Sequence, residues 1–189
     1  PYDSMNVADY VGDDPSSVAR NIETVAGYCG ATDIAVMKAE HGSRALTVTA
    51  GGVCEPADIL VTKSRGLALL ALAADCVPFA LVSRNSDVIS VAHVGWKGLL
   101  AHAVDSAVDA FTHAGAQVSG TVAVIGPSIC GRCYEVSEEL AQQISSDFPR
   151  ARVDSRHVDL AAATQGRLEE LGVSVQRIAG CTCEDQNLF

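Results

Sequence analysis

Cysteine and histidine residues flank a predicted β-hairpin in the middle of the chain. The apolar runs Phe79–Val82 and Val88–Ala92 are joined by a polar turn, which is the pattern of two antiparallel strands. Cys76 precedes the first run and His93 follows the second, two positions from exact register, so both leave the hairpin at the same end. Facing side chains in such a pair lie about 4.5–5.5 Å apart at Cβ, which is close enough to share a metal ion.

His41 is the third candidate ligand, because it follows a predicted strand and directly precedes Gly42. Two histidines and one cysteine with an open fourth position form a catalytic zinc arrangement. Cu²⁺ binds the same nitrogen and sulfur ligands, more tightly than Zn²⁺ does. The pattern therefore predicts that His41, Cys76 and His93 hold zinc, with copper as a second occupant of the same site.

Two alternative interpretations of these residues need no metal ion. In the first, Cys76 is a small buried apolar side chain and His93 is a hydrogen-bonded core histidine. In the second, Cys76 is a thiolate nucleophile and His93 is its base, an arrangement that leaves His41 without a role.

A second group of cysteines lies in the C-terminal half of the chain. Cys130-Gly131-Arg132-Cys133 is a CxxC motif and Cys181-Thr182-Cys183 is a CxC motif, and together they could form a structural zinc site. The spacing favours another interpretation, because CxC is a poorer partner for CxxC than a second CxxC. In that interpretation residues 126–133 form a glycine-bearing loop that shapes a pocket, with Arg132 available for an anion.

The elements that must position these residues are helices and strands without strict alternation, so the predicted fold class is mixed α/β. Asp14-Pro15 starts a helix that ends at Gly30, since Asp caps helices and Pro suits their first position. The other predicted helices are Leu99–Ala114, a helix capped by Ser137 with Glu138 and Glu139 in its first turn, and Asp159–Leu171. The predicted strands are Ile34–Met37, Ile59–Thr62, Leu67–Ala73, Phe79–Val82, Val88–Ala92, Val122–Ile125 and Val175–Ile178.

The composition is that of one globular domain. The chain has 189 residues, of which 48% are hydrophobic and 19% charged, and we expect a single catalytic domain over residues 1–189 with both ends incomplete. A net charge of −10 argues against a nucleic-acid-binding face. No apolar run approaches the roughly 20 residues of a membrane span. Seven scattered cysteines without a visible signal peptide predict reduced thiols in the cytoplasm.

Three blocks of the sequence, in this order, resemble the signature of one family. They are Ala74-Asp75-Cys76-Val77-Pro78, His93-Val94-Gly95-Trp96-Lys97-Gly98, and Gly126-Pro127-Ser128-Ile129-Cys130-Gly131-Arg132-Cys133-Tyr134-Glu135-Val136. His41-Gly42 and Cys181-Thr182 are shorter matches. The chain resembles, over essentially its whole length, the YfiH-like purine nucleoside phosphorylases. That family was long labelled a laccase-type multicopper polyphenol oxidase and is also called peptidoglycan editing factor.

The resemblance implies a two-sheet mixed β core flanked by helices, with zinc held by His41, Cys76 and His93. It implies phosphorolysis of adenosine, inosine and S-methyl-5′-thioadenosine, accompanied by adenosine deamination. The expected partners are purine nucleosides and phosphate, with neither nucleic acid nor membrane. We expect a monomer or a weak homodimer.

Four further residues have hypothetical roles. Asp75 moves the proton when a water, whose pKa zinc lowers toward ~7, attacks adenine C6; alternatively, Asp75 orients a zinc-binding histidine. Lys97 and Arg132 are the candidates for phosphate, with solvated surface charges as the alternative, and Asn6 is a candidate for ribose or base. The family has Arg at the position of Lys97, Gln at the position of Ala39 and a closing Ser-Tyr-Arg-Arg run, so this sequence departs from it mainly in phosphate binding.

Three rival functions are considered beside this one. A cysteine hydrolase or amidase acting on cell-wall peptides would use Cys76 and His93 and would need no metal. A metal-stabilised binding module would turn over no substrate. A copper polyphenol oxidase needs about ten histidines for its trinuclear and blue-copper centres, whereas this chain has five.

Overall fold

The computed structural model describes residues 5–186 and 188. In this part of the chain the strands form a six-stranded sheet, ordered β2-β4-β7-β6-β8-β9, and a three-stranded sheet, ordered β3-β1-β5. The helices are α1 (Pro15–Tyr28), α2 (Trp96–Leu100), α3 (Ala103–His113), α4 (Glu138–Asp147) and α5 (Leu160–Glu170), with a 3₁₀ turn η1 (Pro149–Ala151). The strands are β1 (Asp33–Lys38), β2 (Ala45–Thr47), β3 (Gly52–Pro56), β4 (Ile59–Thr62), β5 (Leu67–Leu70), β6 (Val77–Ser83), β7 (Ile89–Val94), β8 (Thr121–Ile125) and β9 (Ser174–Arg177). The predicted mixed α/β class with two sheets is confirmed.

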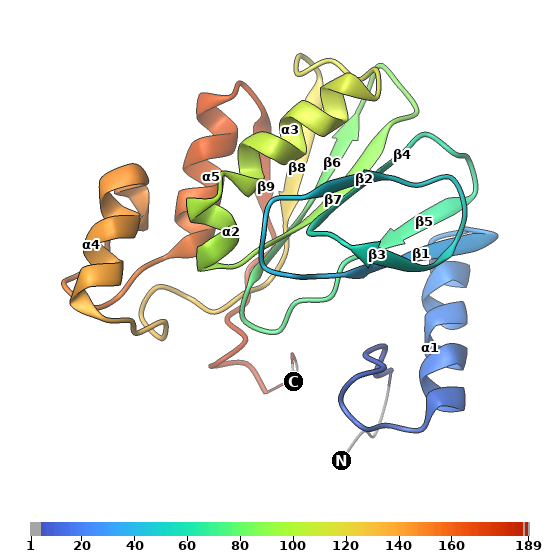
Figure 1. Cartoon of the computed structure of the whole chain (residues 1–189), viewed down its shortest axis with the longest axis horizontal. Coiled ribbons are helices and arrows are strands. Elements are labelled where there is room, and N and C mark those ends of the chain that lie inside the picture. The colour runs from blue at the N-terminus through green and yellow to red at the C-terminus, as the bar shows by residue number, and fades with distance from the viewer. Residues whose placement is uncertain (1–4, 187, 189) are drawn as a thin grey trace.

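The six-stranded sheet lies between a helical layer and the smaller sheet (Figure 1). Helices α2, α3 and α5 pack on its strands, and β5 of the smaller sheet contacts β4 and β7. In β4, Ile59 and Val61 belong to the apolar cluster beneath the helices, whereas Leu60 belongs to the cluster shared with the smaller sheet. Because successive strand residues point to opposite faces, both faces of β4 are covered, which explains its unbroken apolar run.

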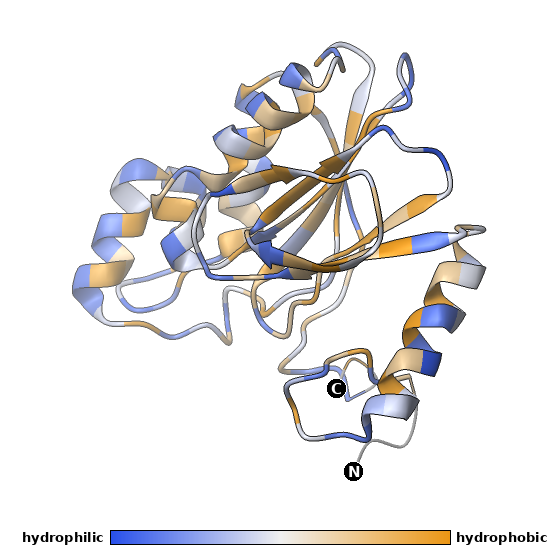
Figure 2. Cartoon of the chain, turned by 45° about the vertical axis from the view of Figure 1, so that its right-hand side comes forward, coloured by the Kyte–Doolittle hydropathy of each residue, from blue (hydrophilic) through white to orange (hydrophobic). Residues whose placement is uncertain are grey.

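The hydropathy pattern agrees with this layering. In Figure 2 the central strands are mostly hydrophobic, while the helices alternate hydrophilic and hydrophobic residues along the ribbon. Helix α3 buries Val104, Val108 and Phe111, which recur at the three- to four-residue spacing of one helix face. Within the described residues, no helix is both long enough and apolar enough to cross a bilayer.

The β6–β7 hairpin has the predicted register. Val77 pairs with Val94, and Pro78 pairs with His93. Cys76 therefore lies one residue before β6, opposite Gly95 by extension of the ladder. The prediction that Cys76 and His93 reach the same end of the hairpin is confirmed.

The predicted continuous helix Leu99–Ala114 is wrong. The structure has two helices, α2 and α3, separated at His102, whose backbone is left-handed with φ of 57°. The two helices pack differently: Gly98 of α2 lies so close to the Gly42 carbonyl that a Cβ there would be 2.8 Å from its oxygen, whereas α3 packs along β7. Apolar spacing does not reveal such a one-residue break, because the spacing of apolar residues continues across it.

The predicted helix starts are confirmed by hydrogen bonds at their caps. The side chains of Asp14, Ser137 and Asp159 each accept an amide hydrogen bond from the first turn of α1, α4 and α5. Each cap satisfies an amide that has no partner within its own helix.

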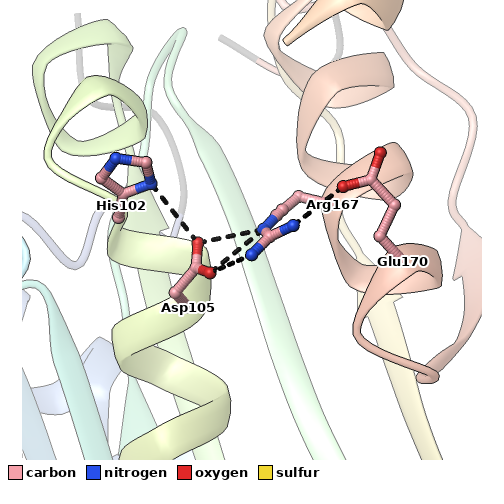
Figure 3. A network of polar contacts seen from close by, with 4 residues as sticks. All are labelled: His102, Asp105, Arg167 and Glu170. Carbon is pink, nitrogen blue, oxygen red and sulfur yellow. Dashed lines mark hydrogen bonds and ion pairs between the residues drawn. The ribbon is translucent and has the colours of Figure 1, made fainter. Parts of the chain in front are cut away.

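Helices α3 and α5 are joined by a charged network (Figure 3). Arg167 of α5 donates from Nε to both carboxylate oxygens of Asp105 on α3, at 3.1 and 3.2 Å, and from Nη1 to Glu170 at 2.9 Å. His102, at the break between α2 and α3, lies 3.7 Å from Asp105. The network ties α5 to α3, which packs on β7, the strand that carries His93.

Candidate metal centre

Three potential metal ligands from distant parts of the sequence meet beside Gly95, the residue that precedes α2. His41 lies in the loop after β1, Cys76 directly before β6, and His93 within β7. One donor atom from each lies within 4.8 Å of the other two. The two imidazole rings are edge to face, with centroids 4.9 Å apart and an interplanar angle of 89°. Two nitrogens and one sulfur on three sides of a point leave the fourth side open.

Asp58, directly before β4, holds two of these ligands in place. Its carboxylate is fully buried and accepts a hydrogen bond from Nδ1 of His93 at 2.9 Å, which leaves Nε2 as the donor toward an ion. The same carboxylate accepts the amides of Glu40, His41 and Gly42, at 3.3, 2.9 and 2.7 Å. These bonds hold the left-handed backbone of His41, with φ of 62°, a conformation that costs about 1–2 kcal/mol for a residue with a side chain.

The electrostatics of the centre favour the uncharged forms of His93 and Cys76. Burial lowers the pKa of His93, although the carboxylate of Asp58 acts in the opposite direction. Burial raises the pKa of Cys76, and the carboxylates of Asp75 and Asp58 raise it further. A neutral imidazole is ready to bind a cation, whereas the Cys76 thiol must first lose its proton to that cation.

Gly95 makes room for the ligands. A Cβ at this position would lie 3.0 Å from the Cys76 sulfur and 3.2 Å from Cδ2 of His41. The backbone φ of Gly95 is −86°, which any residue can adopt. The requirement for glycine here is therefore one of space and not of backbone conformation.

A pocket of about 710 Å³ opens beside the three ligands, within the usual size range of small-molecule sites. It lies between the smaller sheet, the N-terminal loop and the segment before β6. The described residues that line it are Asp9, Tyr10, Val36, Met37, Lys38, Ala39, His41, Val53, Leu72, Ala73, Ala74, Asp75, Cys76 and His93. The structure thus brings Asp75 and the three predicted ligands to one cavity.

The residues predicted to bind substrate or phosphate lie outside this lining. The Asn6 amide group bonds to Ala8 and Asp13 in its own loop. Lys97 is exposed, with Nζ 5.5 Å from the ring centroid of its neighbour Trp96, and Trp96 packs against the core. The remaining candidate, the exposed Arg132, pairs with Glu184 at 3.1 Å. Their predicted roles stay predictions, and the geometry gives them no direct support.

Asp58 is the residue that the sequence interpretation missed. The carboxylate that orients a histidine is that of Asp58, whereas Oδ1 of Asp75 accepts a hydrogen bond from the Thr182 hydroxyl at 2.8 Å. The available signal was an aspartate directly before the wholly apolar run Ile59–Val61, since a carboxylate in a buried strand needs partners.

The chain is similar to proteins of one family over its whole given length. The family model described as multi-copper polyphenol oxidoreductase laccase matches residues 1–189. A purine nucleoside phosphorylase of Streptomyces coelicolor is 39% identical over 182 residues, covering 92% of this chain and 75% of the relative. An adenosine deaminase from an unknown prokaryotic organism is 29% identical over 216 residues, covering 100% and 81%. The crystal structure of the Bacillus licheniformis hypothetical protein YfiH has a TM-score of 0.82 at 25% identity, covering 97% and 78%. The chain therefore belongs to the family described as multi-copper polyphenol oxidoreductase laccase, whose YfiH-like fold it has, and its relatives include proteins named purine nucleoside phosphorylase.

Proposed function

We propose that this protein is a zinc-dependent purine nucleoside phosphorylase. It would cleave adenosine, inosine and S-methyl-5′-thioadenosine with phosphate, giving the free base and the ribose or methylthioribose 1-phosphate, and would also deaminate adenosine. The observation that carries the proposal is the convergence of His41, Cys76 and His93 on one wall of the 710 Å³ pocket. The names of relatives agree with it.

The three residues fit zinc. Imidazole nitrogen and thiolate sulfur are ligands that this ion prefers, and Asp58 behind His93 supplies the supporting hydrogen bond usual for a metal-binding histidine. Cu²⁺ would bind the same ligands. When bound, the ion supplies Lewis acidity to an oxygen in the pocket.

In phosphorolysis the pocket must hold an anion beside a flat aromatic base. A phosphate oxygen bonds to ribose C1′ while the C1′–N9 bond breaks. The electron pair of the broken bond leaves with the base, which gains a proton. We assign the phosphate to Lys38, the lysine among the described lining residues, because Lys97 and Arg132 lie elsewhere. Leu72 and Ala73 offer apolar contact to the base, and the exposed ring of Tyr10 can stack on it.

In deamination, water adds to adenine C6 and ammonia leaves. Asp75 lines the pocket beside Cys76 and is the carboxylate that we assign to take the proton from water and return it to the leaving amine. The Thr182 hydroxyl fixes Oδ1 of Asp75, so the transfer is assigned to Oδ2.

The proposal is tested by incubating zinc-loaded protein with adenosine, with and without phosphate, and identifying the products. Adenine formed only with phosphate demonstrates phosphorolysis, and inosine formed in either case demonstrates deamination. If neither adenine nor inosine is formed, the proposal is overturned.

One observation favours a second candidate function, that of a cysteine hydrolase. The Asp58 carboxylate binds the His93 imidazole, and the Cys76 sulfur lies near that imidazole. An acid, a base and a nucleophile are thus arranged in space in the order that nucleophilic catalysis requires. Against it stand the raised pKa of the Cys76 thiol, caused first by burial, and the third ligand His41. Stoichiometric loss of peptide or amide hydrolysis upon alkylation of the metal-free protein would favour the hydrolase.

A further inference from the structure

Two cysteine-bearing segments are brought together by the pairing of β8 with β9. These strands are parallel neighbours, so the segments that leave their carboxyl ends continue side by side. The Ile178 amide donates to Ile125 at 2.9 Å, and a bridge then pairs Ser128 with Cys181. The CxxC motif on one segment therefore faces the CxC motif on the other.

The sulfur atoms at this junction have the spacing of a metal site. The Sγ atoms of Cys130, Cys133 and Cys181 all lie within 4.8 Å of one another, and all three thiols are free. Zinc–sulfur bonds of about 2.3 Å in tetrahedral geometry place sulfur atoms roughly 3.8 Å apart. Small side-chain adjustments would bring the three sulfurs to that distance.

Both segments turn in the same way around the sulfur atoms. The Cys130 carbonyl accepts the amides of Cys133 and Tyr134, both at 3.0 Å. The Cys181 carbonyl likewise accepts the amides found three and four residues later, at 3.1 and 2.9 Å. The two turns thereby bring the sulfur atoms of Cys130, Cys133 and Cys181 to one junction.

A backbone amide already points at one of these sulfurs. The buried Cys181 Sγ accepts the Cys130 amide at 3.3 Å. Amide donors of this kind stabilise a thiolate, the form that binds a metal ion.

A fourth thiol completes the set. The Cys133 thiol lies within 4.8 Å of those of Cys130 and Cys181, and Cys183 follows Cys181 by two residues in the same turn. Cys183 is exposed, so its side chain can turn toward the centre. Glu184 is the competing fourth ligand, with its carboxylate 3.6 Å from the Cys133 sulfur, but Arg132 already binds that carboxylate.

We propose that Cys130, Cys133, Cys181 and Cys183 bind a second zinc ion, in a closed structural site separate from the His41 centre. Four thiolates leave no position open for substrate, and such sites stabilise folds. None of the four residues is among the described lining of the 710 Å³ pocket, so the proposal does not depend on the proposed function.

The second ion would fasten one wall of the first centre. Thr182, between two of the ligands, donates its hydroxyl to Asp75, and the Ile129 amide donates to the Asp75 carbonyl at 3.0 Å. Asp75 directly precedes Cys76. Ordering the two turns therefore orders the residue next to a ligand of the first centre.

The test is metal content per chain, measured by elemental analysis of reduced protein loaded with zinc and freed of excess. The wild-type chain should carry two zinc ions, Cys133→Ser one and Cys76→Ala one. The matched control Cys29→Ser, at an exposed cysteine outside both groups, should carry two. Two ions retained in Cys133→Ser, or none in Cys76→Ala, would overturn the proposal, as would a Cys130–Cys133 disulfide found in the loaded protein.

A variant at an exposed position, combined with a chelator titration, distinguishes loss of the second ion from misfolding. Cys183→Ser changes an exposed side chain and should lose the second ion at chelator concentrations that leave the wild type fully loaded. Glu184→Gln should behave like the wild type; the reverse ranking would overturn the assignment of Cys183. Cys76→Ala loaded with cobalt should show sulfur-to-cobalt charge-transfer absorption. The double variant that carries both Cys76→Ala and Cys133→Ser should lack this absorption.

Discussion

The buried carboxylate of Asp58 binds the imidazole of His93 at 2.9 Å and, through three backbone amides, the loop that carries His41. One side chain directly before β4 thereby sets the orientation of two candidate metal ligands, His41 in a loop and His93 on β7. Asp58 is therefore a positioning residue, and its replacement should lower the affinity for the metal ion as well as the free energy of unfolding.

Asp58→Asn is expected to weaken zinc binding by about 10–100-fold, the usual effect of losing a hydrogen-bond partner of a metal-binding histidine. The amide also fails to accept all of the present donors, which should lower the free energy of unfolding by about 1–3 kcal/mol. Competition with a chelator and urea unfolding measure the two effects. Asp87→Asn, at an exposed aspartate paired with Arg65, is the control; equal zinc affinity in both variants would contradict the role of Asp58.

Cys76→Ala is expected to abolish zinc binding at the first centre and nucleoside turnover with it, because two histidines alone hold the ion weakly. The fold should persist, since alanine fills most of the volume of cysteine. Cys54→Ala, outside the lining of the pocket, should keep both properties. Turnover of adenosine by metal-free Cys76→Ala would refute the proposed function.

The hairpin part of the centre was predictable from the sequence because its register is local. Five polar residues separate the two apolar runs, so the relative positions of Cys76 and His93 follow from counting. Helix starts at Asp14, Ser137 and Asp159 were predictable for the same reason, since a cap acts within one turn.

Features that depend on distant partners were not predictable in this way. Strands β2 and β3 pair in parallel with β4 and β1, and they are too short and irregular in pattern to stand out. The role of Asp58 arises only when β1, β4 and β7 meet. The left-handed backbone of His102 separates α2, which packs on the Gly42 loop, from α3. Apolar periodicity does not reveal such a break.

Gly95→Ala is expected to perturb the first centre without unfolding the protein. The new methyl group would lie 3.0 Å from the Cys76 sulfur, so the sulfur or the His41 ring must move. We expect zinc affinity to fall at least about tenfold while the unfolding midpoint changes little. Gly27→Ala is the matched control, because a Cβ there meets nothing within 4 Å; unchanged zinc affinity in Gly95→Ala would show that the ligands are not confined as described.

The ion pair between Asp105 and Arg167 (Figure 3) should make stability depend on acidic pH. Burial raises the pKa of Asp105, but the Arg167 guanidinium and then His102 outweigh it, so the pKa lies below the usual 3.8. A lowered pKa means that the stabilisation is complete above pH 3.8 and disappears as the pH falls through the folded-state value. Asp105→Asn should therefore cost about 1 kcal/mol at neutral pH and nothing once the wild-type carboxyl is protonated. Urea unfolding of both proteins at neutral pH and at a pH below the folded-state pKa of Asp105 checks this. An equal loss in free energy of unfolding at the two pH values would contradict the role of the ion pair.

Lys38 and Lys97 make opposite predictions for phosphate. Lys38 lines the pocket beside the three ligands, whereas Lys97 is exposed on α2 and lies against Trp96. Lys38→Ala should raise the phosphate KM of adenosine phosphorolysis about tenfold or more, since it removes a charge-assisted contact of about 1.5–3 kcal/mol, and should leave zinc content and deamination unchanged. Lys97→Ala should have little effect on any of these. Initial rates at varied phosphate concentration separate the two lysines. If Lys97→Ala raises the phosphate KM and Lys38→Ala does not, the substrate must approach the centre from the α2 side, and the pocket described here is not the phosphate site.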